Sequence, residues 1–296
     1  MREVTSGPQL SEEQLNGIID RALVEDIGPG DVTSEMLIPP DLHGQAFLLI
    51  KARGILAGGE VARRVFLRVD PSLRVEWHIA DGARVKLGDK VATVSGKIVS
   101  ILKAERVVLN FLQRLSGVAS ETARYVAKTR GLAAKVTDTR KTTPGIRILE
   151  KYAVRIGGGH NHRFHLGDGI LIKDNHLAAL RALSWSLKDV VAEVKGRALP
   201  GLPVEVEVTT IKETLAAVEA GADIIMLDNM SLDEMRRAVS LMPPRVKTEA
   251  SGGVTLANIR TVAMTGVDNI SVGALTHSTK ALDISLELEP QMLKLF

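Results

Sequence analysis

The chain of 296 residues contains no cysteine. This absence excludes a disulfide framework, thiolate chemistry and cysteine-ligated metal sites. Aromatic residues make up only 3% of the chain, so the core has to be built from aliphatic side chains. The shortage of aromatic rings also argues against single-stranded nucleic-acid binding, in which bases stack on such rings.

Long apolar runs and a strong charge of one sign are missing as well. No apolar stretch approaches the ~20 residues of a membrane-spanning helix, and the first residues, MREVTSGPQLSEEQ, lack an apolar signal core. The formal net charge is only +3, without the long basic stripe that nucleic acid selects. With 45% hydrophobic residues, we expect a globular, cytoplasmic protein that binds neither nucleic acid nor membrane.

Residues 1–115 are predicted to form an α+β sandwich domain. The stretch 74–102 has short strands separated by Asp-Gly and Gly-Asp turns, and it resembles lipoyl carrier domains. A carrier needs a modified lysine at a hairpin tip, for which Lys97 is a weak candidate, so we interpret this stretch as scaffold. A helix over 104–131 follows, and Arg106 and Arg114 lie outside its apolar stripe. We predict that Arg114 is a solvated surface residue.

Beyond this helix, strands and helices alternate. The predicted strands are 202–208, 223–229, 245–251 and 268–275, and the helices between them are 210–222, 231–242 and 254–267. Such alternation indicates right-handed βαβ units and a parallel sheet, and its repetition favours a barrel. We therefore assign 116–276 to an α/β domain with a (β/α) barrel-like fold, expected to be incomplete and open.

Acidic residues recur with the same period as the strands. Glu207, Asp228 and Glu249 are spaced 21 residues apart, each close to the C-terminal end of its strand. Those ends open on one face of a parallel barrel, so the three carboxylates are expected to surround one mouth. The alternative is that each acid caps the following helix, but three in register favour a site. Glu205 shares the parity of Glu207 and could contribute.

Basic residues gather in the segment that precedes these strands. Between 140 and 176 it contains Arg140, Lys141, Arg147, Lys151, Arg155, Arg163 and Lys173, and His160, His162, His165 and His176. A strand over 170–176 is expected to bring Lys173 to the face of the carboxylates. The alternatives are a zinc site at His160, His162 and His165, which lack a strong ligand motif, and a solvated basic surface.

Two glycine-containing segments suggest a phosphate site. SGG (251–253) lies between a strand and a helix, and VGALTH (272–277) follows the last strand. The late loops of barrels often bind phosphate through free backbone N–H groups. Guanidinium groups bind carboxylates, and carboxylates suit sugar hydroxyls or Mg²⁺. The expected ligands are an anionic acid and a magnesium-bound sugar phosphate.

Several long motifs closely resemble the quinolinate phosphoribosyltransferase family, in the same order from about residue 11 to 288. They are TDTRKTTPGIRILEKYAVRIGGGHNHRFHLGDGILIKDNH (137–176), AERVVLNFLQRLSGVAS (104–120), EVEVTT (205–210), LDNM (227–230), EASGGV (249–254) and DNISVGALTHS (268–278). The resemblance implies an enzyme of NAD synthesis that converts quinolinate and phosphoribosyl pyrophosphate to nicotinate mononucleotide, pyrophosphate and carbon dioxide. It also implies that 277–296 returns to the first domain.

The resemblance further implies roles for individual residues. The quinolinate-binding residues would be Thr139, Arg140, His162, Arg163 and Lys173, with Arg106 from the neighbouring subunit of a homodimer or higher even oligomer whose sites are interfacial. Lys141, Glu207 and Asp228 would be catalytic, with Lys141 at the phosphates and the two acids at the ribose hydroxyls and Mg²⁺. The remaining residues at phosphoribosyl pyrophosphate, around its 5′-phosphate, would be Ser251, Gly252, Gly253, Gly273, Ala274 and His277.

Two other functions remain open on the sequence. One is a related phosphoribosyltransferase acting on nicotinate or another pyridine-like acid, including the paralogue associated with molybdenum transport. The other is a non-catalytic sensor of sugar phosphates on the same barrel. The many cations, suited to two carboxylates, favour quinolinate over nicotinate.

Overall fold

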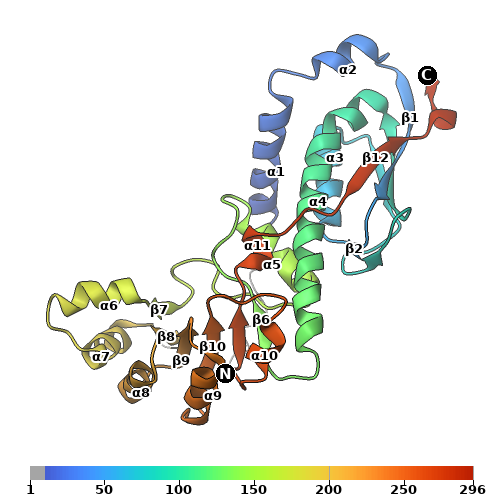
Figure 1. The fold of residues 1–296 in the computed structure, drawn as a ribbon. Coiled ribbons are helices and arrows are strands. Elements are labelled where there is room, and N and C mark those ends of the chain that lie inside the picture. Colours follow the sequence, from blue (N-terminus) through green and yellow to red (C-terminus); the bar gives the residue numbers. More distant parts are fainter. Residues whose placement is uncertain (1–10, 200, 296) are drawn as a thin grey trace. The chain divides into compact units, whose positions relative to one another are not determined.

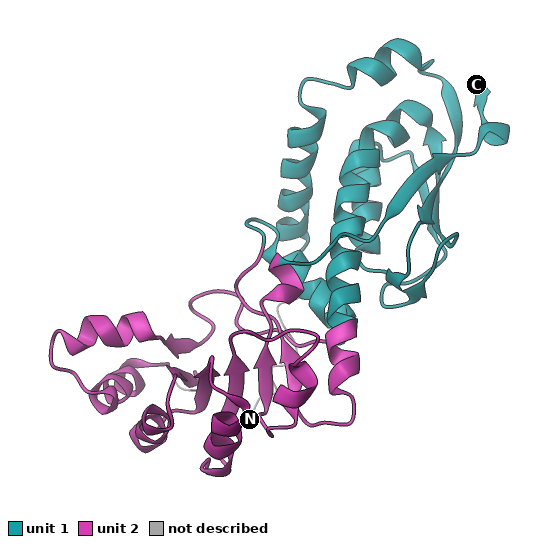
Figure 2. Ribbon diagram, viewed as in Figure 1, with its two compact units in different colours: residues 1–123, 143–158, 278–296 teal, residues 124–142, 159–277 magenta. Residues whose placement is uncertain are grey.

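The computed structural model describes residues 11–199 and 201–295. The chain divides into two compact units (Figure 2). The first unit combines the described residues up to Ala123 with Thr143–Gly158 and the segment from Ser278 onward. The second unit contains Arg124–Thr142 and Gly159–His277. Among the described residues, no helix is long and apolar enough to cross a membrane.

The first unit contains an antiparallel sheet. Its strand order is β12-β1-β5-β3, with β13 also paired to β1, and β2 pairs separately with β4. Their bounds are β1 Leu42–Ile50, β2 Gly54–Ile55, β3 Arg74–Trp77, β4 Arg84–Val85, β5 Lys90–Lys97, β12 Ile284–Leu288 and β13 Lys294–Leu295. Alternate residues of β1 (Ala46, Leu48 and Ile50) are buried, as the two-residue period of a strand requires.

Helices complete this unit. They are α1 Glu12–Ile27, α2 Val32–Leu37, α3 Gly59–Val69, α4 Ile98–Thr129 and α5 Arg147–Ile156, with the 3₁₀ turn η1 at Pro290–Met292; residues 124–129 of α4 belong to the second unit. α1 begins where Ser11 accepts a hydrogen bond from the backbone N–H of Gln14, at 3.1 Å. α4 starts six residues earlier than the sequence pattern suggests, because Ile98 and Ile101 are also buried on its apolar face.

Arg114 is not the solvated surface residue that we predicted. Its guanidinium group donates to the carboxylate of Glu150 from Nε at 2.9 Å and from Nη2 at 2.6 Å. Glu150 is fully buried and also accepts hydrogen bonds from the backbone and hydroxyl of Thr143. A buried carboxylate needs such partners, and the apolar periodicity of α4 carries no information about an acid 36 residues away.

The second unit is a six-stranded parallel sheet with order β6-β11-β10-β9-β8-β7. The strands are β6 Lys135–Thr137, β7 Ile170–Ile172, β8 Val204–Val208, β9 Ile224–Asp228, β10 Lys247–Ser251 and β11 Asn269–Ser271. Within the described ranges, β6 and β7 are the two edges and do not pair with each other, so the sheet is not closed. The prediction of an α/β protein with an open barrel-like domain and a separate α+β domain is confirmed.

The connecting helices follow the predicted alternation. They are α6 Asp174–Arg181, α7 Leu187–Arg197, α8 Ile211–Ala220, α9 Leu232–Ser240, α10 Ile259–Ala263 and α11 Ala274–His277. Figure 1 shows α7, α8 and α9 in a row along one side of the sheet, and α8 contacts both β8 and β9. The predicted helix over 254–267 is reduced to α10, and the predicted strand over 170–176 ends at Ile172.

Strand parity decides which side chains reach the inner face. Val204, Val206 and Val208 of β8 are buried on one face, so Glu205 and Glu207 point to the other. Residues paired in register point to the same side of a sheet. The register pairs Glu207 with Met226, Met226 with Glu249, and Asp228 with Ser251. All these side chains therefore lie on one face of the sheet, opposite to the face that carries the three valines of β8.

Candidate active site

Most residues predicted for the site lie at the C-terminal ends of the parallel strands of the second unit. Thr139, Arg140 and Lys141 follow β6, and Lys173 directly follows β7 as the N-cap of α6. Glu207 lies in β8, and Asp228 and Ser251 are the last residues of β9 and β10. The topology therefore brings these groups to one end of the sheet, the end at which all its parallel strands finish. Parallel barrels have their active sites at this end.

Glu207 and Lys173 form an ion pair at this end of the sheet. Lys173 Nζ donates to Glu207 Oε2 at 3.0 Å, and the Glu207 side chain is 13% exposed. Asp228 lies on the neighbouring strand, and its Oδ2 accepts from Asn229 Nδ2 at 2.8 Å. The backbone N–H of Asn229 donates to Ser251 O at 2.9 Å, which ties the ends of β9 and β10 together. Glu207, paired with Lys173, and Asp228 thus lie on adjacent strands of the sheet.

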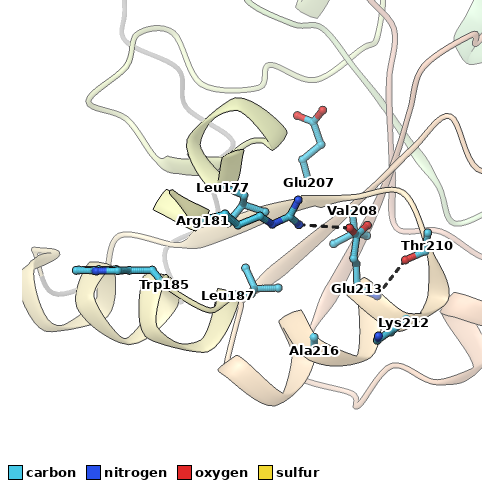
Figure 3. Close-up of a pocket in the computed structure, with 10 residues that line it drawn as sticks. All are labelled: Leu177, Arg181, Trp185, Leu187, Glu207, Val208, Thr210, Lys212, Glu213 and Ala216. Atoms are coloured by element: carbon cyan, nitrogen blue, oxygen red, sulfur yellow. Dashed lines mark hydrogen bonds and ion pairs between the residues drawn. The ribbon is translucent and has the colours of Figure 1, made fainter. Parts of the chain in front are cut away.

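A cavity adjoins this arrangement and shares Glu207 with it. It has a volume of about 290 Å³ and lies between α6, α7, α8 and β8. Figure 3 shows Glu207 pointing away from the Arg181–Glu213 ion pair, whose nearest atoms are 3.8 Å apart. Glu207 is the only predicted site residue among its lining residues. We therefore place the candidate site at the strand ends and not in this cavity.

Arg140 and Arg163 interact with each other. Burial lowers the pKa of the Arg163 guanidinium group, and the positive charge of Arg140 lowers it further. Glu205 and Asp168 act in the opposite direction. Arg163 is also anchored, because its Nη1 donates to Gly169 O at 3.0 Å. Two cations that disfavour each other's charge are held where an anion would stabilise both.

Asp138 fixes the loop that carries His162 and Arg163. It is fully buried and accepts from the backbone N–H of His162 at 2.8 Å and from Asn161 Nδ2 at 2.6 Å. Its own backbone N–H donates to His160 O at 3.0 Å. We did not predict this role for Asp138; its position directly after a strand, between two threonines, was the available signal.

His162 lies against two buried acids. Its Nε2 is 3.2 Å from Glu205 Oε2 and 3.5 Å from Glu249 Oε1. Ser271 donates a short hydrogen bond to Glu249. Burial, reinforced by the negative charge of Glu205, raises the pKa of Glu249 to about 7. Glu249 is thus a buried partner of His162, whereas we had expected it at an open mouth with Glu207 and Asp228.

The residues predicted for the phosphate end also converge. A Cβ added to Gly273 would lie 3.0 Å from His277 Nε2 and 3.3 Å from Lys141 Cδ, so these three residues are close neighbours. Thr276 Oγ1 donates to Lys141 O at 2.7 Å. Gly252 has φ +87°, and a Cβ there would lie 2.2 Å from Asn229 Oδ1. Only glycine fits this turn. Because glycine has no side chain, nothing on this residue covers the backbone near the end of β10. Gly253 and Ala274 adjoin these two turns.

Two further predictions concern Arg106 and a histidine metal site. Arg106 is exposed on α4 in the first unit. His160, His162 and His165 do not come together as a metal site. The backbone of His160 forms a β-bridge with Thr137, and His165 Nε2 lies 2.7 Å from Asp168 Oδ1. Within the described ranges, one set of three groups has possible metal-ligand atoms within 4.8 Å of one another, namely His162, Glu205 and Glu249.

Comparison with known proteins gives a consistent result over nearly the whole chain. The model "Quinolinate phosphoribosyl transferase, N-terminal domain" matches residues 31–116, and the model of the C-terminal domain of the same family matches 118–287. A protein of Bacillus subtilis named "Probable nicotinate-nucleotide pyrophosphorylase [carboxylating]" is 43% identical over 93% of each chain. The Nicotiana tabacum "Quinolinate phosphoribosyltransferase [decarboxylating] 1b" is 43% identical over 98% of this chain and 86% of its own.

A solved structure supports the same assignment. The nicotinate-nucleotide pyrophosphorylase of Francisella tularensis has a TM-score of 0.89 and 38% identity, over 95% of this chain and 98% of that one. Both domains, the sheet topology and the sequence therefore point to one family. This chain belongs to the quinolinate phosphoribosyltransferase family.

Proposed function

We propose that this protein transfers the phosphoribosyl group of phosphoribosyl pyrophosphate to quinolinate with loss of carbon dioxide, and so makes nicotinate mononucleotide. The observation that carries this proposal is the placement of Arg140 and Arg163 within each other's electrostatic reach. The ion pair of Lys173 with Glu207 lies at the C-terminal end of the same sheet. A cationic group suited to a dicarboxylate thus adjoins acids suited to a ribose.

Quinolinate relieves the repulsion between the two arginines. Guanidinium groups bind carboxylates in pairs of parallel hydrogen bonds, and quinolinate carries two carboxylates on adjacent ring carbons. Arg140 and Arg163 would bind these groups together with Lys173, His162 and the backbone around Thr139. A substrate with one carboxylate, such as nicotinate, would leave part of the positive charge uncompensated.

Phosphoribosyl pyrophosphate would lie along the remaining strand ends. Lys141, Gly273 and His277 are close neighbours, so a lysine and an imidazole can share one phosphate. Ser251, Gly252, Gly253 and Ala274 would line its 5′-phosphate end. Glu207 and Asp228 would accept hydrogen bonds from the ribose hydroxyls.

The same two acids fit a magnesium ion that the substrate brings with it. Mg²⁺ prefers oxygen ligands and is usually bound by one or two carboxylates together with substrate phosphates. Glu207 and Asp228 offer carboxylates on the neighbouring strands β8 and β9, near the C-terminal end of each strand. The ion would supply positive charge that stabilises the departing pyrophosphate.

The charges account for the chemical steps. As the bond from ribose C1 to pyrophosphate breaks, C1 becomes cation-like, and the fixed carboxylates of Glu207 and Asp228 stabilise it. Lys141 stabilises the leaving anion. The pyridine nitrogen bonds to C1 and becomes positively charged. As carbon dioxide leaves, the electron pair of the broken C–C bond stays on the ring carbon next to this nitrogen, whose positive charge stabilises it. That carbon then uses the pair to take up a proton.

We further propose that the protein is a homodimer or higher even oligomer in which Arg106 completes the site of a neighbouring subunit. Arg106 is exposed, off the apolar stripe of α4. An exposed guanidinium group is available to a substrate carboxylate in another subunit. This would add a further cation to the quinolinate pocket.

Paired alanine variants test the division of the site. Arg163→Ala should raise the Kd for quinolinate about 100-fold and change the Kd for phosphoribosyl pyrophosphate little, because it removes a paired charged hydrogen bond. Lys141→Ala, its matched control, should do the reverse. Titration calorimetry measures both constants. Equal losses for both ligands in both variants would contradict the proposed division.

A side-by-side assay separates quinolinate from related acids. Carbon dioxide release with quinolinate supports the proposal. Turnover with nicotinate alone would favour the related transferase, and tight binding without turnover would favour a sensor.

A further inference from the structure

Arg163 begins a loop, residues 163–169, that leads from His162 into β7. Residues 165–168 of this loop are exposed, and the side chain of Leu166 at its centre is 70% exposed. Packing against the sheet therefore contributes little to the shape of the loop. Hydrogen bonds within the loop define its shape instead.

Asp168 is at the centre of these hydrogen bonds. Its Oδ2 accepts from the backbone N–H of Phe164 at 2.7 Å and from that of His165 at 3.2 Å. Its Oδ1 lies 2.7 Å from His165 Nε2. The other ring nitrogen of His165, Nδ1, accepts from the backbone N–H of Gly167 at 3.2 Å. One carboxylate thus joins the two sides of the loop, and His165 supports it.

Arg163 is held at two points by Asp168 and the residue that follows it. The backbone directly after Arg163, at Phe164, is bound to Asp168. The Arg163 guanidinium group donates from Nη1 to Gly169 O at 3.0 Å. Burial and the charge of Arg140 lower the pKa of Arg163, whereas the charges of Glu205 and Asp168 raise it. Asp168 therefore acts on Arg163 through both geometry and charge.

We propose that Asp168 is a positioning residue that holds Arg163 in place for a carboxylate of the substrate. This inference rests on the proposed quinolinate site of Arg140 and Arg163. An arginine side chain loses rotamer freedom when it binds an anion, and a guanidinium group that is ordered beforehand loses less. An acid that does not touch the substrate thereby strengthens the binding of a negatively charged substrate.

Binding measurements on an alanine variant test this role. Asp168→Ala should raise the Kd for quinolinate about tenfold and leave the Kd for phosphoribosyl pyrophosphate within about twofold of wild type. Asp189→Ala is the matched control, because Asp189 is also exposed and accepts from a backbone N–H three residues earlier, that of Ser186, at 2.9 Å. The control should lower the Tm and change neither Kd. An equal rise of both Kd values in Asp168→Ala overturns the proposal.

A double-mutant cycle tests whether Asp168 acts through Arg163. In protein that already carries Arg163→Ala, the further change Asp168→Ala should alter the Kd for quinolinate by less than about twofold. Competition calorimetry measures the weaker affinities. A further tenfold loss in the double variant would show that Asp168 acts independently of Arg163, and it overturns the proposal.

Asp168→Asn is the second variant, in case Asp168→Ala does not fold. Its amide oxygen can still accept from the backbone N–H of Phe164, but the charge that faces Arg163 is lost. The Kd for quinolinate should therefore rise by about threefold, less than in the alanine variant. Unchanged quinolinate affinity in both variants overturns the proposal, and so does unchanged affinity in Asp168→Asn alone if Asp168→Ala is unfolded.

Arg163→Ala separates a failure of this inference from a failure of the proposed function. If Arg163→Ala weakens quinolinate binding and the Asp168 variants do not, only this inference fails. If Arg163→Ala also has no effect, the quinolinate site itself is wrong.

Discussion

At the scale of single residues, Glu249 couples the site to pH. Burial raises its pKa from about 4.5 to about 7, with Glu205 adding to the shift. The folded protein therefore binds more protons than the unfolded chain between these values. By linkage, the free energy of unfolding falls as pH rises through this window and the loss is complete above it.

The variant Glu249→Gln should remove this loss. Relative to wild type, its free energy of unfolding should rise by about 3 kcal/mol from pH 5 to pH 8. Urea titrations at the two pH values measure the difference, and the exposed Glu219→Gln serves as the control. The same pH dependence in Glu249→Gln and wild type would show that Glu249 titrates normally in the folded protein.

The sequence predicted the types of residue in the site better than their pairings. Three acids with the strand period and a run of cations were visible, and the fold brings Lys173 and Glu207 together. The interaction of Glu249 with His162 depends on strand parity and register across β8, β9 and β10. The spacing of acids along a chain does not specify which inner-face acids meet a histidine from a loop.

At the scale of elements, the C-terminal segment is packed against α4. Leu282 N donates to Gln113 O at 2.9 Å, and Gln113 Nε2 donates to Ile284 O at 2.7 Å. A Cβ added to Gly117 would lie 2.2 Å from the backbone oxygen of Lys280. Glycine at this position allows the two segments to approach closely, at the expense of helix propensity.

Gly117→Ala should therefore destabilise the protein, by roughly 2 kcal/mol, because backbone cannot move aside cheaply. Gly17→Ala is the matched control, since it also lies in a helix but its Cβ would have no neighbour closer than 3.8 Å. The control should be neutral or slightly stabilising, because alanine favours helix. Chemical denaturation measures both. Equal stability of the two variants would refute the close approach.

Elements were predicted in proportion to the strength of their pattern. The strands and helices from β8 to β10 occupy nearly the predicted ranges, because apolar periodicity and capping residues such as Thr210 and Ser231 mark them. α10 is shorter than predicted. β7 stops before Lys173, which caps α6. Apolar residues continue on both sides of α10, so composition alone does not mark its ends, whereas the residues that follow β7 are polar.

At the scale of the whole molecule, subunit mixing tests the proposed role of Arg106. Neither Arg106→Ala nor Lys141→Ala should be active alone. If Arg106 acts in the neighbouring subunit, a heterodimer has one site with both residues intact. An equal, random mixture of dimers should then recover about a quarter of wild-type activity. No recovery, with heterodimers present by native mass spectrometry, would place Arg106 in its own subunit.

The central claim is that cations of 140–173 and acids of the parallel strands make one site for a pyridine diacid and an activated ribose. A crystal structure with quinolinate bound tests this most directly. We predict both carboxylates within hydrogen-bond distance of the Arg140 and Arg163 guanidinium groups, with the ring nitrogen toward Glu207 and Asp228. Quinolinate bound elsewhere, with no contact to either arginine, would contradict the account.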